Sequence, residues 1–125
     1  MTFIRTIIVA LLFLVNFGVF AQSRLGFTFK EIINQFPNEV TKYDANIGMI
    51  FVDLSDCEVI HYFDNNLCIM SAIYPKTQQG TMFFKEKYDR MYYKMNDYTW
   101  KGFLNGAEVT ISAARAGDNV SYTWR

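Results

Sequence analysis

Residues 57–75, CEVIHYFDNNLCIMSAIYP, decide the fold of this chain. They contain two apolar segments, residues 57–63 and 67–74, on either side of Asp64-Asn65-Asn66. Asn and Asp tolerate the left-handed backbone conformation that tight hairpin turns require. The stretch is therefore predicted to form an antiparallel β-hairpin that ends at Pro75.

A first helix is predicted to begin next to Thr28. Thr28 and Glu31 have the spacing of a capping box, in which the hydroxyl accepts from the backbone of residue 31 and the carboxylate accepts from that of residue 28. Phe27 and Ile32 are placed as a hydrophobic staple. Apolar residues follow at i, i+3, i+4 and i+7 from residue 29, and Pro37 ends the pattern.

Helical periodicity returns between residue 77 and about residue 95. Its apolar positions are Phe84, Tyr88, Met91, Tyr92 and Met95. Basic side chains lie mostly on the opposite side, which predicts an amphipathic helix of four or five turns. The C-terminal end of this helix is left open, because residues 92 and 93 also suit an extended chain.

The other strands are predicted from apolar runs and turn residues. Residues 48–54 form one such run. Residues 98–104 and 107–114 flank Asn105-Gly106, a strong hairpin signal, and Gly117-Asp118 leads into a last strand at residues 119–124. A short helix over residues 97–104, ended by Asn105-Gly106, is the alternative interpretation.

The predicted order is helix, three strands, helix, three strands. This order favours an α+β fold, with an antiparallel sheet of about six strands covered on one face by two helices. The two αβββ halves share no residue-level repeat. The other face of the sheet must then contact water, a partner or another copy of the chain.

The first 21 residues have the pattern of a cleavable signal peptide. Arg5 precedes an apolar run at residues 7–15, and Val19-Phe20-Ala21 resembles a cleavage site, after which Gln22 is the new N-terminus. A retained membrane anchor is the alternative, but only about 15 residues are available where a bilayer core requires about 20. Residues 22–125 are thus expected to be one domain, exported to the periplasm or beyond the cell and free of the membrane.

The charges of the chain give no basis for binding nucleic acid. Twelve basic residues balance twelve acidic ones, and the basic residues of the second predicted helix alternate with acidic residues. The composition is that of a globular protein, with 51% apolar and 18% aromatic residues.

The two cysteines are predicted to be buried and unpaired. In the predicted hairpin, Cys68 lies opposite about Tyr62 or His61, and Cys57 lies four or five residues further along. At about 3.3 Å per residue this separates the cysteines by roughly 13 to 16 Å. A disulfide requires Cα atoms within about 7 Å.

His61 and Cys68 are the only residues that suggest nucleophilic catalysis. A cysteine nucleophile needs a base within hydrogen-bonding reach, and the hairpin places these residues side by side. A small secreted hydrolase that uses His61 with Cys68 or a carboxylate is therefore the alternative function. One histidine and two separated cysteines do not make a zinc site, and no cofactor motif is present.

Aromatic residues are the most distinctive feature of the chain. Tyr98, Trp100, Tyr122 and Trp124 have the same parity on two predicted strands, and Tyr88, Tyr92 and Tyr93 come from the second predicted helix. One interpretation is that the helix packs on these rings as core. The other is that part of the set, with Tyr43, Tyr62 and Tyr74, forms an exposed contact surface.

We therefore expect an exported, non-enzymatic binding or envelope-assembly domain that acts through an aromatic sheet face. The candidates for its binding site are Tyr93, Tyr98, Trp100, Tyr122 and Trp124. The expected partner is a protein or peptide, and no catalytic, metal or cofactor site is assigned.

Overall fold

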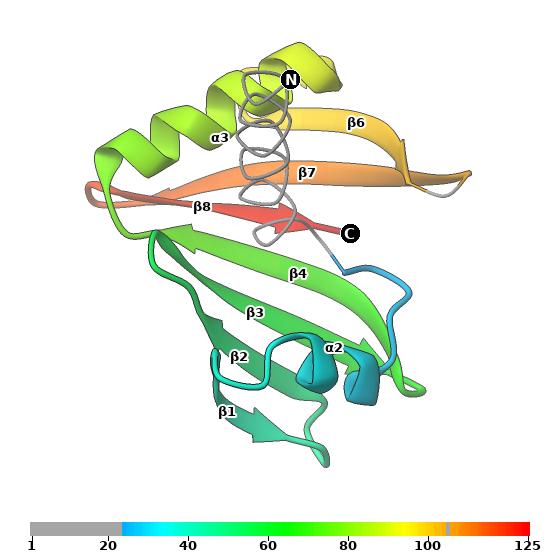
Figure 1. Cartoon of the computed structure of the whole chain (residues 1–125). Helices are drawn as coiled ribbons and strands as arrows, with labels where there is room; N and C mark the ends of the chain where they lie inside the picture. The colour runs from blue at the N-terminus through cyan, green and yellow to red at the C-terminus, as the bar shows by residue number, and fades with distance from the viewer. Residues whose placement is uncertain (1–23, 105) are drawn as a thin grey trace, which may run out of the picture.

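The predicted hairpin is the centre of the fold. The structure is a computed structural model that describes residues 24–104 and 106–125, and it forms the hairpin from β3 (Cys57–Asp64) and β4 (Leu67–Pro75) (Figure 1). Asn65 and Asn66 have φ values of 50° and 63°. These values lie in the left-handed region, as the Asp64-Asn65-Asn66 turn predicts.

The strands of the described residues form one antiparallel sheet in the order β1-β2-β3-β4-β8-β7-β6-β5. The first half of the chain supplies four neighbouring strands and the second half supplies the other four. The halves join where β4 pairs with β8, through only three residue pairs. The remaining strands are β1 (Val40–Asp44), β2 (Met49–Asp53), β5 (Tyr93–Asn96), β6 (Thr99–Leu104), β7 (Ala107–Ala116) and β8 (Asn119–Trp124).

This α+β sheet has eight strands, so the predicted number of six is wrong. The additional strands, β1 and β5, are the two edges of the sheet. The central residues of β1 and all residues of β5 are exposed, so neither strand shows alternation of buried and exposed side chains. The short helix proposed for residues 97–104 is also wrong, because residues 99–104 form β6.

Both predicted helices are present. α2 (Phe29–Gln35) begins with the complete capping box, in which Glu31 N donates to Thr28 Oγ1 at 3.2 Å and Thr28 N donates to Glu31 Oε1 at 3.1 Å. α3 (Gln78–Met91) is capped by Thr77, whose hydroxyl accepts from Gly80 N at 3.0 Å. α3 ends before Tyr93 because the chain there turns into β5.

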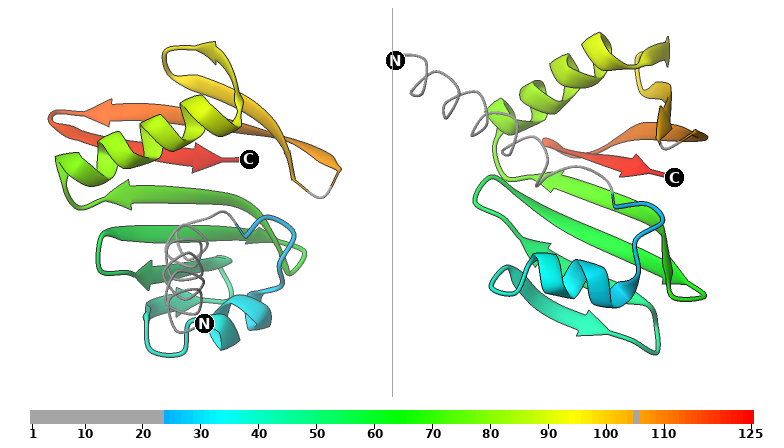
Figure 2. Two further views of the ribbon diagram at one scale, coloured as in Figure 1. Left: turned by 45° about the horizontal axis from the view of Figure 1, so that its top comes forward. Right: turned by 45° about the vertical axis from the view of Figure 1, so that its right-hand side comes forward.

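The helices lie on the same side of the sheet and divide it between them (Figure 2). The Phe29 ring of α2 packs against Tyr43 and Phe63 of the first half. The Tyr88 ring of α3 packs against the rings of β6 and β8. Beneath them one row of register partners crosses six strands, and every member is buried: Ile50, His61, Ser71, Trp124, Ile111 and Trp100.

The two cysteines are unpaired and buried, as predicted. Cys57 pairs with Pro75 and Cys68 with Phe63, so the thiols lie at opposite ends of the hairpin. A bulge between Tyr62 and Phe63 shifts the register from that expected for Cys68. Burial, with a smaller contribution from Asp56, raises the pKa of Cys57 to about 12.

The predicted leader, residues 1–21, lies outside the described residues. In the part of the chain that the structure describes, no helix is long and apolar enough to cross a membrane.

Candidate functional site

Three of the five predicted binding residues belong to the core beneath α3. Trp100, Tyr122 and Trp124 are 0%, 1% and 2% exposed. The Tyr88 ring lies 5.6, 5.3 and 5.6 Å from their rings, between centroids. The polar edges of these aromatic side chains are also occupied, because all three donate hydrogen bonds to α3. The aromatic face formed by these three residues is therefore covered, and a partner cannot reach it.

Tyr93 and Tyr98 are exposed, at 74% and 67%. They lie apart from each other. Tyr93 pairs with Lys101 and is on the side of the sheet away from the helices, whereas Tyr98 occupies the turn between β5 and β6. The structure thus does not bring the five predicted residues together into one surface.

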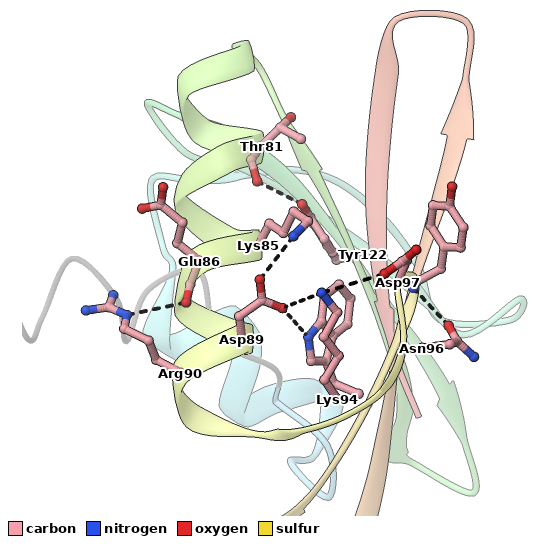
Figure 3. Close-up of polar contacts among 11 residues, drawn as sticks. Thr81, Lys85, Glu86, Asp89, Arg90, Lys94, Asn96, Asp97 and Tyr122 are labelled. Atoms are coloured by element: carbon pink, nitrogen blue, oxygen red, sulfur yellow. Dashed lines mark hydrogen bonds and ion pairs between the residues drawn. The ribbon is translucent and has the colours of Figure 1, made fainter.

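Asp89 is the polar centre of the α3 interface (Figure 3). Its carboxylate accepts from Trp100 Nε1 at 2.8 Å and from Lys85 Nζ at 3.0 Å, and Lys94 Nζ lies 3.6 Å away. The hydrogen bond from Trp100, with that from Lys85, lowers the pKa of Asp89. Asp89 therefore holds a buried indole and two surface cations, which is a structural role.

The His61 cluster lies inside the fold. His61 Nδ1 is 2.8 Å from Ser71 Oγ and 3.9 Å from Cys68 Sγ, and all three residues are buried. Burial, with a smaller contribution from Arg24, lowers the pKa of His61 to about 4, and burial raises the pKa of Cys68. At neutral pH the imidazole is uncharged and the thiol keeps its proton. This geometry supplies no activated nucleophile for the alternative hydrolase.

The uncovered face of the sheet changes its chemistry halfway across. One row of register partners on this face crosses six strands, from β2 to β6: Phe51, Ile60, Ala72, Thr123, Ser112 and Thr99. The first three members are apolar and the last three carry hydroxyls. Solvated sheet faces are normally polar at such positions, so along this row the members from β6 to β8 have the expected chemistry and those from β2 to β4 do not.

We call the apolar side chains of this half the apolar half-face: Met49, Phe51, Ile60, Tyr62, Met70 and Tyr74. All six are half-buried or exposed. Tyr62 and Tyr74 belong to the contact set suggested by the sequence. The other four were missed, because β2, β3 and β4 carry apolar residues on both faces and their sequences show no clean alternation that separates the two faces.

Other kinds of site have less support. Three grooves of the described surface do not include His61, Ser71 or Cys68, and Tyr74 is the only member of the apolar half-face that lines one of the three. Within residues 24–104 and 106–125, no three His, Cys, Asp or Glu side chains gather as metal ligands.

Comparisons with known proteins give no further guide to function. The chain matches no family model, no curated protein and no solved structure.

Proposed function

We propose that this chain is an exported, non-enzymatic domain that binds a protein partner through the apolar half-face. The observation that carries the proposal is the contrast along one row of the uncovered face. Phe51 and Ile60 occupy positions equivalent to those of Ser112 and Thr123, yet only the second pair suits water. A soluble sheet retains half-exposed rings and aliphatic side chains on one half of a face when something other than water covers them.

The composition of the apolar half-face fits a protein rather than a small ligand. Protein interfaces are enriched in Tyr, Phe and Met at their centre and carry charged residues at their rim. The apolar half-face has this arrangement. Lys42 lies over the Phe51 ring, with its Nζ 5.7 Å from the ring centroid, and Glu58 pairs with Tyr74 at the other margin.

The two helices of the described chain do not provide this cover. α2 and α3 lie on the opposite side of the sheet (Figure 2). The apolar half-face therefore offers its side chains to a second molecule, which supports a binding role.

Export is part of the proposal, and it is supported by the signal-peptide pattern of residues 1–21. Its test is separate from the test of binding. Mass spectrometry of the protein recovered from the producing cells should give Gln22 as the first residue. A mature protein that still begins at Met1 would contradict cleavage.

The experiment for binding exchanges the chemistry of the two halves. In the test variant, Phe51→Thr, Ile60→Thr and Tyr62→Thr make the apolar half-face resemble the other half. In the matched control, Thr99→Val, Ser112→Val and Thr123→Val change the same number of residues in the hydroxyl half. Threonine and valine both suit strands, and circular dichroism checks that each variant is folded.

Each immobilised protein is then exposed to an envelope extract of the producing cells. We expect the wild type and the valine variant to retain the same protein and the threonine variant to lose at least nine-tenths of it, an effect of roughly 1.4 kcal/mol. Equal retention by the folded threonine variant would contradict binding through the apolar half-face.

A further inference from the structure

A groove of about 510 Å³ lies on the helix side of the molecule, between α3 and the strands beneath it. α3 contributes Met82 and Lys85 to its walls, Tyr98 stands at the turn between β5 and β6, and Ala113, Arg115 and Val120 come from the sheet. Sites for small molecules typically have volumes of about 300 to 1,000 Å³. The groove is thus of a size that suits a small molecule.

The lining of the groove offers apolar surface from Met82, Tyr98, Ala113 and Val120. Trp100 and Tyr122 also border it, but they are only 0% and 1% exposed, and their polar atoms already have partners. The Tyr122 hydroxyl donates to the Thr81 carbonyl oxygen at 2.8 Å, and Trp100 Nε1 donates to Asp89. A ligand in the groove would therefore meet mainly Met82, the Tyr98 ring and small aliphatic side chains, with charged contacts at the rim.

The charges at the rim do not cancel. Lys85 pairs with Asp89 at 3.0 Å, and Lys94 lies 3.9 Å from Asp97 (Figure 3). Arg115 makes no side-chain hydrogen bond or ion pair with any residue that the structure describes. Of these residues, Lys85, Asp97 and Arg115 line the groove itself, which gives two cations and one anion, and Arg115 is the cation without a counter-ion among the described residues.

We propose that this groove binds a small amphiphile with an apolar body and a single carboxylate, and that Arg115 binds the carboxylate. The apolar lining suits the body of such a ligand, and a guanidinium is well matched to a carboxylate because it can donate two parallel hydrogen bonds. This site is on the opposite side of the sheet from the apolar half-face. It is therefore independent of the proposed protein-binding function.

Three probes with the same ten-carbon chain test the head group: decanoate, decanol and decyltrimethylammonium. Each is titrated into the mature protein below its micelle concentration or, for decanol, below its solubility limit, and backbone amide NMR shifts report the site. We expect saturable binding of decanoate, with shifts centred on Tyr98, Ala113 and Arg115, and binding of decyltrimethylammonium at least tenfold weaker. Equal binding of the two charged probes, shifts centred on the apolar half-face, or no saturable binding would overturn the proposal.

Two substitutions separate the roles of head and body. Arg115→Gln should weaken the binding of decanoate about tenfold or more, which is the usual scale of a charge-assisted hydrogen bond. It should leave the binding of decanol unchanged. Tyr98→Ala should weaken the binding of both decanoate and decanol, because it removes an exposed wall of the groove. Arg90→Gln is the control, since Arg90 is an exposed α3 residue outside the groove, and it should change neither. Equal loss of decanoate binding with Arg115→Gln and Arg90→Gln would contradict the assignment of Arg115.

Discussion

Ala72 of β4 pairs with Thr123 of β8, and at this pair the uncovered face of the sheet changes from apolar to hydroxyl-bearing. The same pair lies in the short seam that joins the two halves of the chain. The residue pairs on either side of this one have their side chains on the helix side of the sheet. Ser71 pairs with Trp124 and Ile73 pairs with Tyr122, and all four residues are buried. The two halves thus share one core, but along this row of the uncovered face only the first half is apolar.

The Asp89 carboxylate should be important for stability because it accepts from a fully buried indole. Asp89→Ala leaves Trp100 Nε1 without its acceptor, and we expect the free energy of unfolding to fall by about 1 to 3 kcal/mol. Asp89→Asn should cost less, since its amide oxygen can still accept. Urea denaturation measures both changes.

Asp97→Ala is the control for this prediction. Asp97 is highly exposed and lies 3.9 Å from Lys94, so its loss should change the free energy of unfolding by less than about 0.5 kcal/mol. Equal effects at Asp89 and Asp97 would show that the indole hydrogen bond contributes nothing measurable.

Replacing either of two glycines by alanine should change the free energy of unfolding, but in opposite directions. A Cβ atom at Gly102 would lie 2.4 Å from Tyr92 Cδ1, so the ring must move, and we expect a loss of about 1 to 3 kcal/mol in the free energy of unfolding. At Gly80, in α3, the nearest atoms to an added Cβ are at 3.4 Å. Alanine favours a helix more than glycine does, so Gly80→Ala is expected to raise the free energy of unfolding by up to about 1 kcal/mol. Thermal or urea unfolding measures both, and a Gly102→Ala variant as stable as the wild type would contradict the packing of Tyr92.

His61 should make the stability depend on pH. Its pKa is lowered to about 4 in the fold, from an ordinary value of 6.5, so the unfolded chain binds a proton that the folded chain excludes between these values. The stabilisation that comes from keeping His61 neutral is fully present above pH 6.5 and is lost as the pH falls towards 4. With one pKa unit worth 1.36 kcal/mol, the total is about 3 kcal/mol.

Urea denaturation at several pH values, with His61→Gln for comparison, measures this contribution. Glutamine does not titrate, so between pH 6.5 and 4 the free energy of unfolding of the His61→Gln variant should change less steeply than that of the wild type. Asp89 affects the stability only at lower pH. Its pKa is lowered in the fold, so the stabilisation that its carboxylate provides is lost only when the pH falls below its ordinary pKa of 3.8. Identical slopes for wild type and His61→Gln would contradict a neutral, buried His61.

The elements that the sequence predicted well are those with local signals. The β3–β4 hairpin has Asn65 and Asn66 in its turn, and α2 has its capping residues within four positions of one another. The edge strands β1 and β5 were missed for a physical reason. An edge strand with exposed side chains shows no buried periodicity, and the apolar pattern of α3 continues to Met95, beyond the end of the helix.

The candidate site depends on register between distant strands, which the sequence does not show. Tyr62 and Tyr74 were named as contact residues, but Trp100, Tyr122 and Trp124 proved to be core. Shared parity indicates that side chains lie on the same face, and it does not indicate which face a helix covers. The contrast at Ala72 and Thr123 links residues 51 positions apart (123 − 72), so only the folded sheet reveals it.

Photocrosslinking in the producing cells tests protein binding by the apolar half-face most directly. A photoreactive benzoylphenylalanine replaces Tyr62 in one version of the full chain and Ser112, on the hydroxyl half of the same face, in another. We predict that irradiation joins the chain to one other protein from position 62 and to none from position 112. Equal crosslinking from both positions, or crosslinks at position 62 only to another copy of this chain or to nothing, would contradict the proposed function.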